Sequence, residues 1–235
     1  MSSSDEYNIQ TWTRLSTDAD REAFPSAIRV GRAAPEFSLP TVDGGRVELA
    51  KLRGEGHVAL VFGCFTAPPC LVQLPALETL HRTYSGRGVS FAFVYTREIH
   101  PGEALPPHHS MEQKMDHARR LRDHGRLTFP VAVDDLSGSV HTAYGAMTSM
   151  AVVVHRDGTL IYRGAWTQAP ILRMVLENLL LRDQVEAAGS PGRTAYHEWL
   201  GFMPREPDDA WETIRLAGPK AWADYRRGLG LPLDS

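Results

Sequence analysis

Two kinds of hydrophobic pattern alternate along the first half of this chain. Residues 57–62 form a short apolar run rich in strand formers, which predicts a buried central strand. Residues 89–95 alternate in the manner of a second strand. Between them, residues 69–84 carry leucines at helical spacing, and Pro75 should kink that helix because proline lacks a backbone N–H. This part of the chain is therefore predicted to be strand, helix, strand.

Further elements alternate beyond residue 100. The elements expected there are a helix at 111–124, a strand at 128–133, a short helix at 137–144, strands at 150–155 and 159–162, and a helix at 168–181. Arg156-Asp157-Gly158 is a hairpin signal, and residues 43–46 are a turn signal between two extended segments. This order indicates an α/β fold with a central mixed sheet flanked by helices. Ligands in such sheets bind beyond the carboxyl ends of the strands, and the turn after residue 62 lies at one of those ends.

The two ends of the chain differ from this central domain, which we place at residues 29–186. Residues 1–28 are polar and predict a tail or one short helix lying on the domain. Residues 187–235 contain three of the five tryptophans, Trp199, Trp211 and Trp222. We expect this extension to form short helices that pack on the domain or on a second subunit, which would give a homodimer. A lid over the active site is the alternative, because such arms often carry function.

Composition narrows the range of partners. The chain has 235 residues, a hydrophobic fraction of 43% and a formal net charge of -3, which are typical of a globular protein. No basic stripe indicates a nucleic-acid partner, and no apolar run reaches the roughly 18 residues of a membrane span. The acidic start lacks the apolar segment of a secretory signal, so we expect a cytoplasmic protein with no membrane partner.

The candidate chemistry lies in the turn after the first predicted strand. The chain has two cysteines, Cys64 and Cys70, and both belong to this turn. Two thiols in a reducing compartment are often core residues. Their placement on either side of one strand–helix turn also suits a redox pair, so both interpretations stay open at this point.

This turn and two other segments resemble those of a known family. Phe62-Gly63-Cys64-Phe65-Thr66-Ala67-Pro68-Pro69 resembles the active-site turn of iodothyronine deiodinases, whose pattern is Phe-Gly-Ser-x-Thr-selenocysteine-Pro-Pro. Residues 94–101 resemble the deiodinase segment that ends in Glu-Ala-His-Pro. Gly31-x-x-Ala34-Pro35-x-Phe37 is similar to the opening motif of peroxiredoxins and related redoxins. The resemblance covers residues 30–181 and implies a thioredoxin-like redoxin fold with oxidoreductase activity.

The sequence departs from this pattern at the residue that carries the family's chemistry. Ala67 stands where the family has selenocysteine or its first cysteine, and alanine is no nucleophile. If Ala67 is an engineered replacement for cysteine or selenocysteine, deiodinase-like or peroxidase-like chemistry is possible at that position. Otherwise, one hypothesis makes Cys70 the attacking thiolate, in the first turn of a helix whose dipole lowers the pKa, and Cys64 the resolving thiol. The alternative is that both cysteines are buried structural residues.

The resemblance also implies roles for residues around the turn. Glu98 and His100 follow the second strand and should face the same cleft, where His100 would assist the reaction or contact the substrate. Thr66 would donate a hydrogen bond to developing charge. The residues expected to line a substrate cleft are Phe65, Ala67, Pro68, Tyr144, Ser149 and Trp166. The alternatives are a solvated His100, a helix-capping Thr66 and aromatic side chains that belong to the core.

Three functions are compatible with these residues. The first is a thiol-dependent oxidoreductase of a small molecule that acts through Cys64 and Cys70 and is recycled by a thiol reductant. The second is an enzyme without thiol chemistry that uses Thr66, Glu98 and His100 for acid–base catalysis. The third is a non-catalytic binding protein with the aromatic extension as its interface.

A metal site is a weaker hypothesis. Two cysteines with a distant histidine form the ligand set of copper-delivery proteins with this fold. The long cysteine spacing and the lack of an export signal argue against that function. His108 and His109 lie in a proline-rich loop and are expected to be exposed. We therefore expect no cofactor and no metal.

Overall fold

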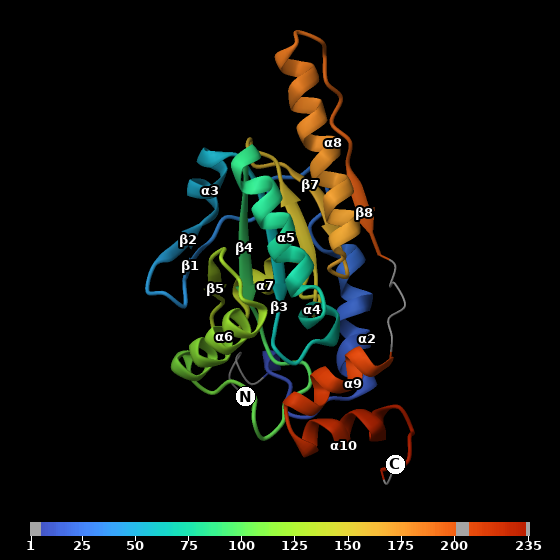
Figure 1. The fold of residues 1–235 in the computed structure, drawn as a ribbon. Helices are drawn as coiled ribbons and strands as arrows, with labels where there is room; N and C mark the ends of the chain where they lie inside the picture. The colour runs from blue at the N-terminus through green and yellow to red at the C-terminus, as the bar shows by residue number, and fades with distance from the viewer. Residues whose placement is uncertain (1–5, 201–206, 234–235) are drawn as a thin grey trace.

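The computed structural model describes residues 6–200 and 207–233, and a mixed sheet of six strands forms its centre (Figure 1). In the order in which they lie, its strands are β5 (Val131–Val133), β4 (Val89–Tyr95), β3 (His57–Gly63), β6 (Ala151–Val154), β7 (Leu160–Gly164) and β8 (His197–Trp199). β3 and β4, β4 and β5, and β7 and β8 pair in parallel, whereas β6 is antiparallel to both neighbours. The predicted central mixed sheet is confirmed.

Helices cover both faces of this sheet. The helices with described bounds are α2 (Arg14–Ala23), α3 (Leu49–Glu55), α4 (Pro68–Leu71), α5 (Leu74–Tyr84), α6 (Met111–Gly125), α7 (Ser139–Tyr144), α8 (Ala169–Ala187), α9 (Pro207–Leu216) and α10 (Pro219–Gly228), with 3-10 turns at Phe24–Ser26 and Ser85–Arg87. α5 and α8 lie on one face and α7 lies on the other (Figure 1). A separate ribbon of β1 (Ser38–Pro40) and β2 (Arg46–Glu48) forms around the predicted turn at 43–46.

The alternation of side chains along β3 explains why there are two apolar cores. Ala59 and Val61 belong to the first core, together with leucines of α5 and α8. Leu60 and Phe62 belong to the second core, which also contains Tyr144 of α7. Successive side chains of a strand point to opposite faces, and helices cover both faces here. Every residue of β3 is therefore buried, as is typical of a central strand.

A predicted helix and a predicted strand differ from the structure for reasons that involve proline. The helix expected at 69–84 is two helices, because α4 ends at Leu71 and α5 begins at Leu74. Pro75 lies in the first turn of α5, where its missing N–H breaks no helical hydrogen bond, so it begins a helix instead of kinking one. The strand expected at 128–133 is shortened to Val131–Val133, because Pro130 has no N–H to donate to the sheet.

The chain ends pack closely on the central domain. The described part of the tail includes the short helix α2, and the flanking Trp12 and Phe24 are buried in the first and second cores. The extension after residue 187 was expected to be helical, but it also contributes β8 to the sheet. A strand of three residues carries too little hydrophobic alternation to be predicted. The described helices include none that is both long and apolar enough to cross a bilayer.

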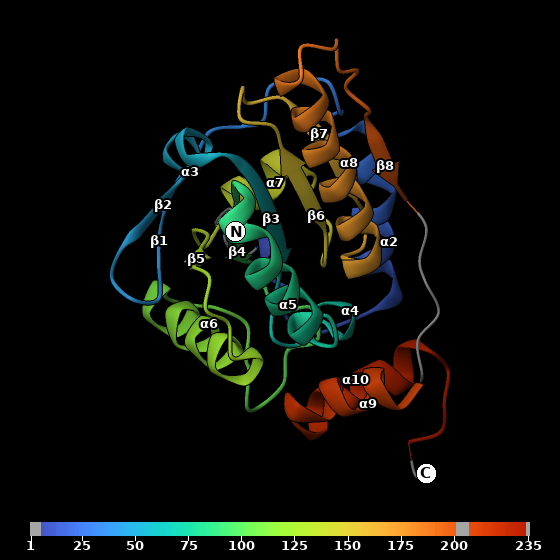
Figure 2. The same ribbon diagram turned by 45° about the horizontal axis from the view of Figure 1, so that its top comes forward.

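The helices α9 and α10 lie at the end of the sheet where α4 begins (Figure 1, Figure 2). Ile214 of α9, Ala217 after it and Ala221 of α10 are buried in the first core, in the same cluster as Cys64 and Cys70. Trp211, in contrast, is only partly buried and packs edge-on against the half-buried Trp222 at a centroid distance of 6.2 Å. The extension therefore covers the turn that the sequence singled out.

Candidate functional site

The candidate site is the turn that follows β3, next to the carboxyl end of β4. The Thr96 backbone N–H and hydroxyl both donate to the Gly63 carbonyl, at 2.8 and 3.1 Å. These bonds bring the residues after Tyr95 against the residues after Gly63. The turn and the segment 96–100 therefore form one unit at this edge of the sheet, as parallel topology predicts.

The first cysteine of the turn is a poor thiolate. Cys64 is fully buried, and its Sγ lies 3.6 Å from the hydroxyl oxygen of Thr66. Burial raises the pKa of the Cys64 thiol well above its usual value, and the nearby Glu98 carboxylate raises it further, although the Thr66 hydrogen bond acts in the opposite direction. Cys64 is therefore a protonated thiol at neutral pH.

The second cysteine lies against the backbone just before the first. Cys70, in the first turn of α4, is fully buried, and no disulfide joins it to Cys64. A Cβ atom placed on Gly63 would overlap the Cys70 Sγ, so only glycine leaves room for this sulfur. Cys70 also contributes to the raised pKa of the Cys64 thiol. The two thiols therefore lie in one buried neighbourhood.

The position between the cysteines has no reactive group. Ala67 is buried, precedes α4 and offers no side-chain cap to the helix. Its carbonyl accepts hydrogen bonds from the backbone N–H groups of Cys70 and Leu71, at 2.9 and 3.0 Å. The backbone of the turn is therefore regular at the residue where the resemblance places a nucleophile.

A buried carboxylate clamps this turn to the segment after β4. The Thr66 backbone N–H and hydroxyl donate to Glu98 Oε2, at 3.1 and 2.7 Å, and the Tyr95 hydroxyl donates to Oε1. The Thr66 hydroxyl oxygen accepts in turn from the backbone N–H groups of Ile99 and His100, at 3.0 and 3.1 Å. Burial alone would raise the pKa of Glu98, but hydrogen bonds from His108 and His117 outweigh it and keep the carboxyl ionised.

His100 is buried beneath the chain ends instead of facing solvent or an open cleft. Its ring centroid lies 4.8 Å from that of Trp12 and 5.4 Å from that of Tyr225 in α10. Burial lowers the pKa of His100 to about 3, so the ring is neutral. Its Nδ1 atom has no hydrogen-bond partner within the described part of the chain.

The residues expected to line a substrate cleft do not gather around one space. Phe65 is in the first core, with its ring centroid 5.3 Å from that of His124. Tyr144 belongs to the second core, where its hydroxyl donates to the Pro35 carbonyl at 2.7 Å, and Trp166 packs against the same core. Tyr144 is therefore a core side chain on the other side of β3 from Phe65, and its role in substrate binding stays a prediction.

The other two lining candidates are also buried. Pro68 begins α4 as part of the turn. Ser149 is fully buried, and its carbonyl accepts from the Thr167 backbone N–H at 2.6 Å. A surface hollow of about 450 Å³ lies elsewhere, between Phe37 and Met111.

The sequence analysis did not identify three residues as part of the site: Tyr95, His108 and His117. His108 was expected to be exposed, but the loop folds inward and buries it, while His109 stays exposed. The one available signal was on α6, where the polar residues Lys114 and His117 share a face with Ala118 and Leu121.

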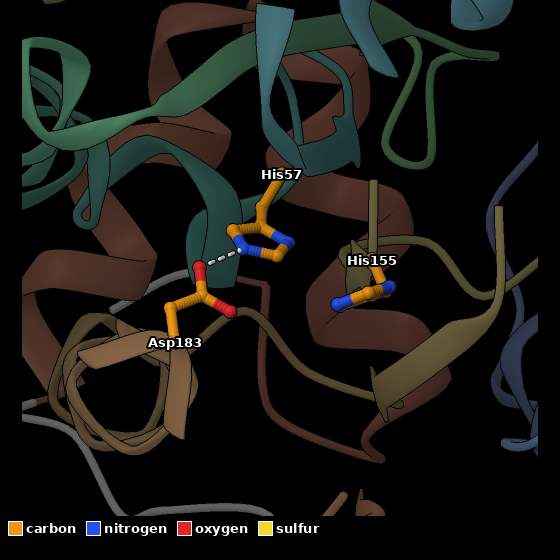
Figure 3. A group of neighbouring side chains, drawn as sticks. All are labelled: His57, His155 and Asp183. Atoms are coloured by element: carbon orange, nitrogen blue, oxygen red, sulfur yellow. Dashed lines mark hydrogen bonds and ion pairs between the residues drawn. The ribbon is translucent and has the colours of Figure 1, made fainter. Parts of the chain in front are cut away.

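Two groups of histidine and carboxylate side chains in the described residues bring potential metal-ligand atoms within 4.8 Å of one another. One is Glu98, His108 and His117, at the turn just described. The other is His57, His155 and Asp183, at the opposite end of β3. Figure 3 shows Asp183 pointing toward His57, with the His155 ring beside them. We call these the carboxyl-end cluster and the amino-end cluster.

Comparison with known proteins places this site in a family. Residues 30–165 match the AhpC/TSA family. The chain belongs to that family. This AhpC/TSA member is 30% identical over 145 residues to thyroxine 5-deiodinase of Sus scrofa, and 28% identical over 123 residues to the thioredoxin-like protein YneN of Bacillus subtilis. These matches cover 57% and 52% of this chain, and 47% and 62% of the relatives. The chain therefore spans about half the length of the deiodinases it matches, and its resemblance to deiodinases and redoxins is confirmed.

Solved structures support the fold. An uncharacterised conserved protein from Geobacillus kaustophilus superposes with a TM-score of 0.54 at 22% identity, covering 75% of this chain and 94% of that one. A putative thiol:disulfide interchange protein DsbE from Chlorobium tepidum superposes with a TM-score of 0.51 at 22% identity, covering 66% and 96%. The thioredoxin-like fold of this AhpC/TSA member is thus confirmed.

Proposed function

We propose that this chain is a thiol-dependent oxidoreductase that reduces a small oxidised molecule by cycling Cys64 and Cys70 between dithiol and disulfide. The observation that carries the proposal is the position of the Cys70 sulfur against Gly63, the residue before Cys64, in the active-site turn of the family. Since the chain has two cysteines and Ala67 occupies the nucleophile position, thiol chemistry requires this pair.

The order of reaction follows from the state of the thiols. Both thiols are buried, and the nearby Glu98 carboxylate further raises the pKa of the Cys64 thiol, so we assign the first attack to Cys70, in the first turn of α4. With a small disulfide as substrate, the Cys70 thiolate forms a mixed disulfide and expels one thiolate, which takes up the Cys70 proton. Cys64 then attacks the Cys70 sulfur, and its proton goes to the second leaving thiolate. Two electrons pass to the substrate, and an external thiol reductant restores the dithiol.

Access to these thiols requires the extension to move. Both cysteines are fully buried and α9 contacts α4, so a substrate would reach the sulfur atoms when α9 and α10 open. This supports the lid interpretation of the extension. We also propose a reducing compartment such as the cytoplasm, where a dithiol is the resting state.

The test is thiol counting under denaturing conditions after exposure to a small disulfide or to hydrogen peroxide. We expect the loss of both thiols with an intact mass lower by two hydrogens, and complete recovery with dithiothreitol. Cys64→Ser and Cys70→Ser should each abolish the intramolecular disulfide. Oxidation of either cysteine to sulfinic acid without disulfide formation would overturn the proposal.

A non-catalytic binding protein is the second candidate, because α9 and α10 cover the turn. For a binding protein, we expect that neither cysteine is oxidised in the same thiol-counting experiment. Acid–base catalysis by Thr66, Glu98 and His100 has less support. Glu98 stays ionised and His100 stays neutral, so neither changes its protonation state near neutral pH.

A further inference from the structure

We propose that Glu98, His108 and His117 bind a divalent cation with the preferences of Zn²⁺. Three atoms from three parts of the chain converge here: Glu98 Oε1 after β4, His108 Nε2 in the following loop and His117 Nδ1 on α6. Their separations are 3.4 Å from Oε1 to Nε2, 3.3 Å from Oε1 to Nδ1 and 3.1 Å between the two nitrogens. Two imidazoles and one carboxylate are a common ligand set for Zn²⁺.

Hydrogen bonds alone do not satisfy this triangle. Each facing nitrogen carries at most one proton, which points to one neighbour. If both nitrogens are protonated, two N–H groups face each other, and Glu98 Oε1 receives three donors because Tyr95 also donates to it. If only one is protonated, a bare imidazole nitrogen faces another lone pair. A single cation at the centre accepts all three lone pairs at once.

The separations also match metal coordination. Zn–N and Zn–O bonds of about 2.0–2.2 Å place tetrahedral ligand atoms about 3.3–3.6 Å apart. The three observed separations, 3.1–3.4 Å, lie close to that range. Three protein ligands leave a fourth position for water or a small molecule, as in zinc sites with an open coordination position.

The surroundings hold the carboxylate in place for such a role. Oε2 of Glu98 is fixed by the backbone N–H and hydroxyl of Thr66, and Tyr95 orients Oε1. Supporting hydrogen bonds of this kind orient metal ligands. The buried cation Lys114 donates instead to the Asp135 carbonyl at 2.8 Å. The side chains of Glu98 and His108 are fully buried, and that of His117 is nearly so.

The test measures Zn²⁺ binding by the full chain, purified without a histidine tag and stripped with a chelator. Calorimetry should give one Zn²⁺ per chain, both for the wild type and for the Cys64→Ser/Cys70→Ser double variant, which removes thiolate ligands. His108→Gln and His117→Gln should each lower the affinity at least tenfold. His109→Gln, the exposed neighbour, and His155→Gln, from the amino-end cluster, should bind as the wild type does.

A spectroscopic readout keeps the test independent of variant folding. Co²⁺ added to the stripped wild-type chain should give the strong visible bands of four-coordinate cobalt, and Zn²⁺ should displace them. Absence of stoichiometric Zn²⁺ binding, a weak six-coordinate cobalt spectrum, or wild-type affinity in folded His108→Gln and His117→Gln variants would each overturn the proposal.

Discussion

The two clusters lie at opposite ends of β3 and each contain two histidines and one carboxylate, yet they differ in what supplies positive charge to the carboxylate. In the amino-end cluster, His57 Nδ1 accepts from the Arg156 backbone N–H at 3.2 Å. The proton therefore lies on Nε2, which donates to Asp183 Oδ2 at 2.7 Å. The Arg156 guanidinium pairs with the same carboxylate. The same guanidinium also lies 2.8 Å from His57 Nε2, so Arg156 supplies the positive charge for this cluster.

The difference teaches that ligand-type residues indicate a metal only where no cationic side chain already neutralises the carboxylate. Arg156 already supplies the positive charge at the amino-end cluster, which joins the start of β3 to α8 and to the hairpin. At the carboxyl-end cluster, the ion pairs of Glu98 within the described residues are with His108 and His117, and Lys114 donates elsewhere. The first cluster is a structural ion pair, and the second is a candidate site.

The largest expected effect is a difference in stability between a Glu98 variant and an Asp183 variant. In Glu98→Gln, the amide oxygen can keep the Thr66 donors, but its N–H₂ then replaces the carboxylate oxygen that accepts from Tyr95 and faces the two histidines. We expect a loss of about 3 kcal/mol of unfolding free energy, the cost of breaking a buried network. In Asp183→Asn, the amide oxygen still accepts from His57, so the loss should be about 1 kcal/mol.

Urea unfolding with a chelator present measures both changes without a contribution from bound metal. Asp183→Asn is the matched control, since it makes the same chemical change at the other cluster. Equal losses in the two variants would contradict the distinction between the clusters.

The next effect concerns α9 and α10, which lie over the carboxyl end of β3 and not over its amino end (Figure 1). A Cβ on Gly102 would overlap the Ala217 carbonyl, so Gly102→Ala should push the α9–α10 pair away from the turn. Overpacking of this kind costs about 1–3 kcal/mol. We expect native-state alkylation of the two cysteines to accelerate by roughly tenfold or more, because local opening becomes easier.

Mass spectrometry after timed iodoacetamide treatment measures that rate. Gly54→Ala, where the added Cβ meets nothing within 4 Å, is the control. If both variants react at the wild-type rate, α9 and α10 do not limit access to Cys64 and Cys70.

Sequence patterns predicted the parts of this molecule that depend on local periodicity. β4 spans Val89–Tyr95, as expected, because alternation and β-branched or aromatic residues persist over its whole length. The resemblance also brought Thr66 and Glu98 together, and the structure joins them by hydrogen bonds. The turn after β3 was located correctly for the same reasons.

The parts that were missed depend on how distant segments fold back. Neither periodicity nor spacing shows that the loop before α6 buries His108 while leaving His109 exposed. The burial of His100 under Trp12 and Tyr225 depends on both chain ends, which lie outside the motifs. Side-chain contacts across such sequence distances leave no local pattern.

A smaller effect is the pH dependence of the amino-end cluster. Burial lowers the pKa of His57 below its usual value, although the Asp183 hydrogen bond acts against this. The unfolded chain therefore binds a proton first as the pH falls below about 6.5, and stability is lost from there down toward the folded pKa. His57→Gln should show a smaller decrease of the urea midpoint between pH 7 and pH 5 than the wild type. An unchanged slope would mean that other histidines account for the acid sensitivity.

The smallest effect is expected for the third member of the amino-end cluster. His155 lies beside His57, with ring centroids 4.7 Å apart, but its Nδ1 contacts Asp157, at 3.2 Å from the backbone nitrogen and 3.0 Å from Oδ1, instead of joining the Asp183 pair. Asp157 also bonds the Thr159 N–H, so the hairpin turn keeps its own support without the imidazole. His155→Gln should therefore change the unfolding free energy by less than about 1 kcal/mol. Thermal melts with and without Zn²⁺ check this, since a metal held by His57, His155 and Asp183 would make the variant lose a Zn²⁺-dependent stabilisation that the wild type shows.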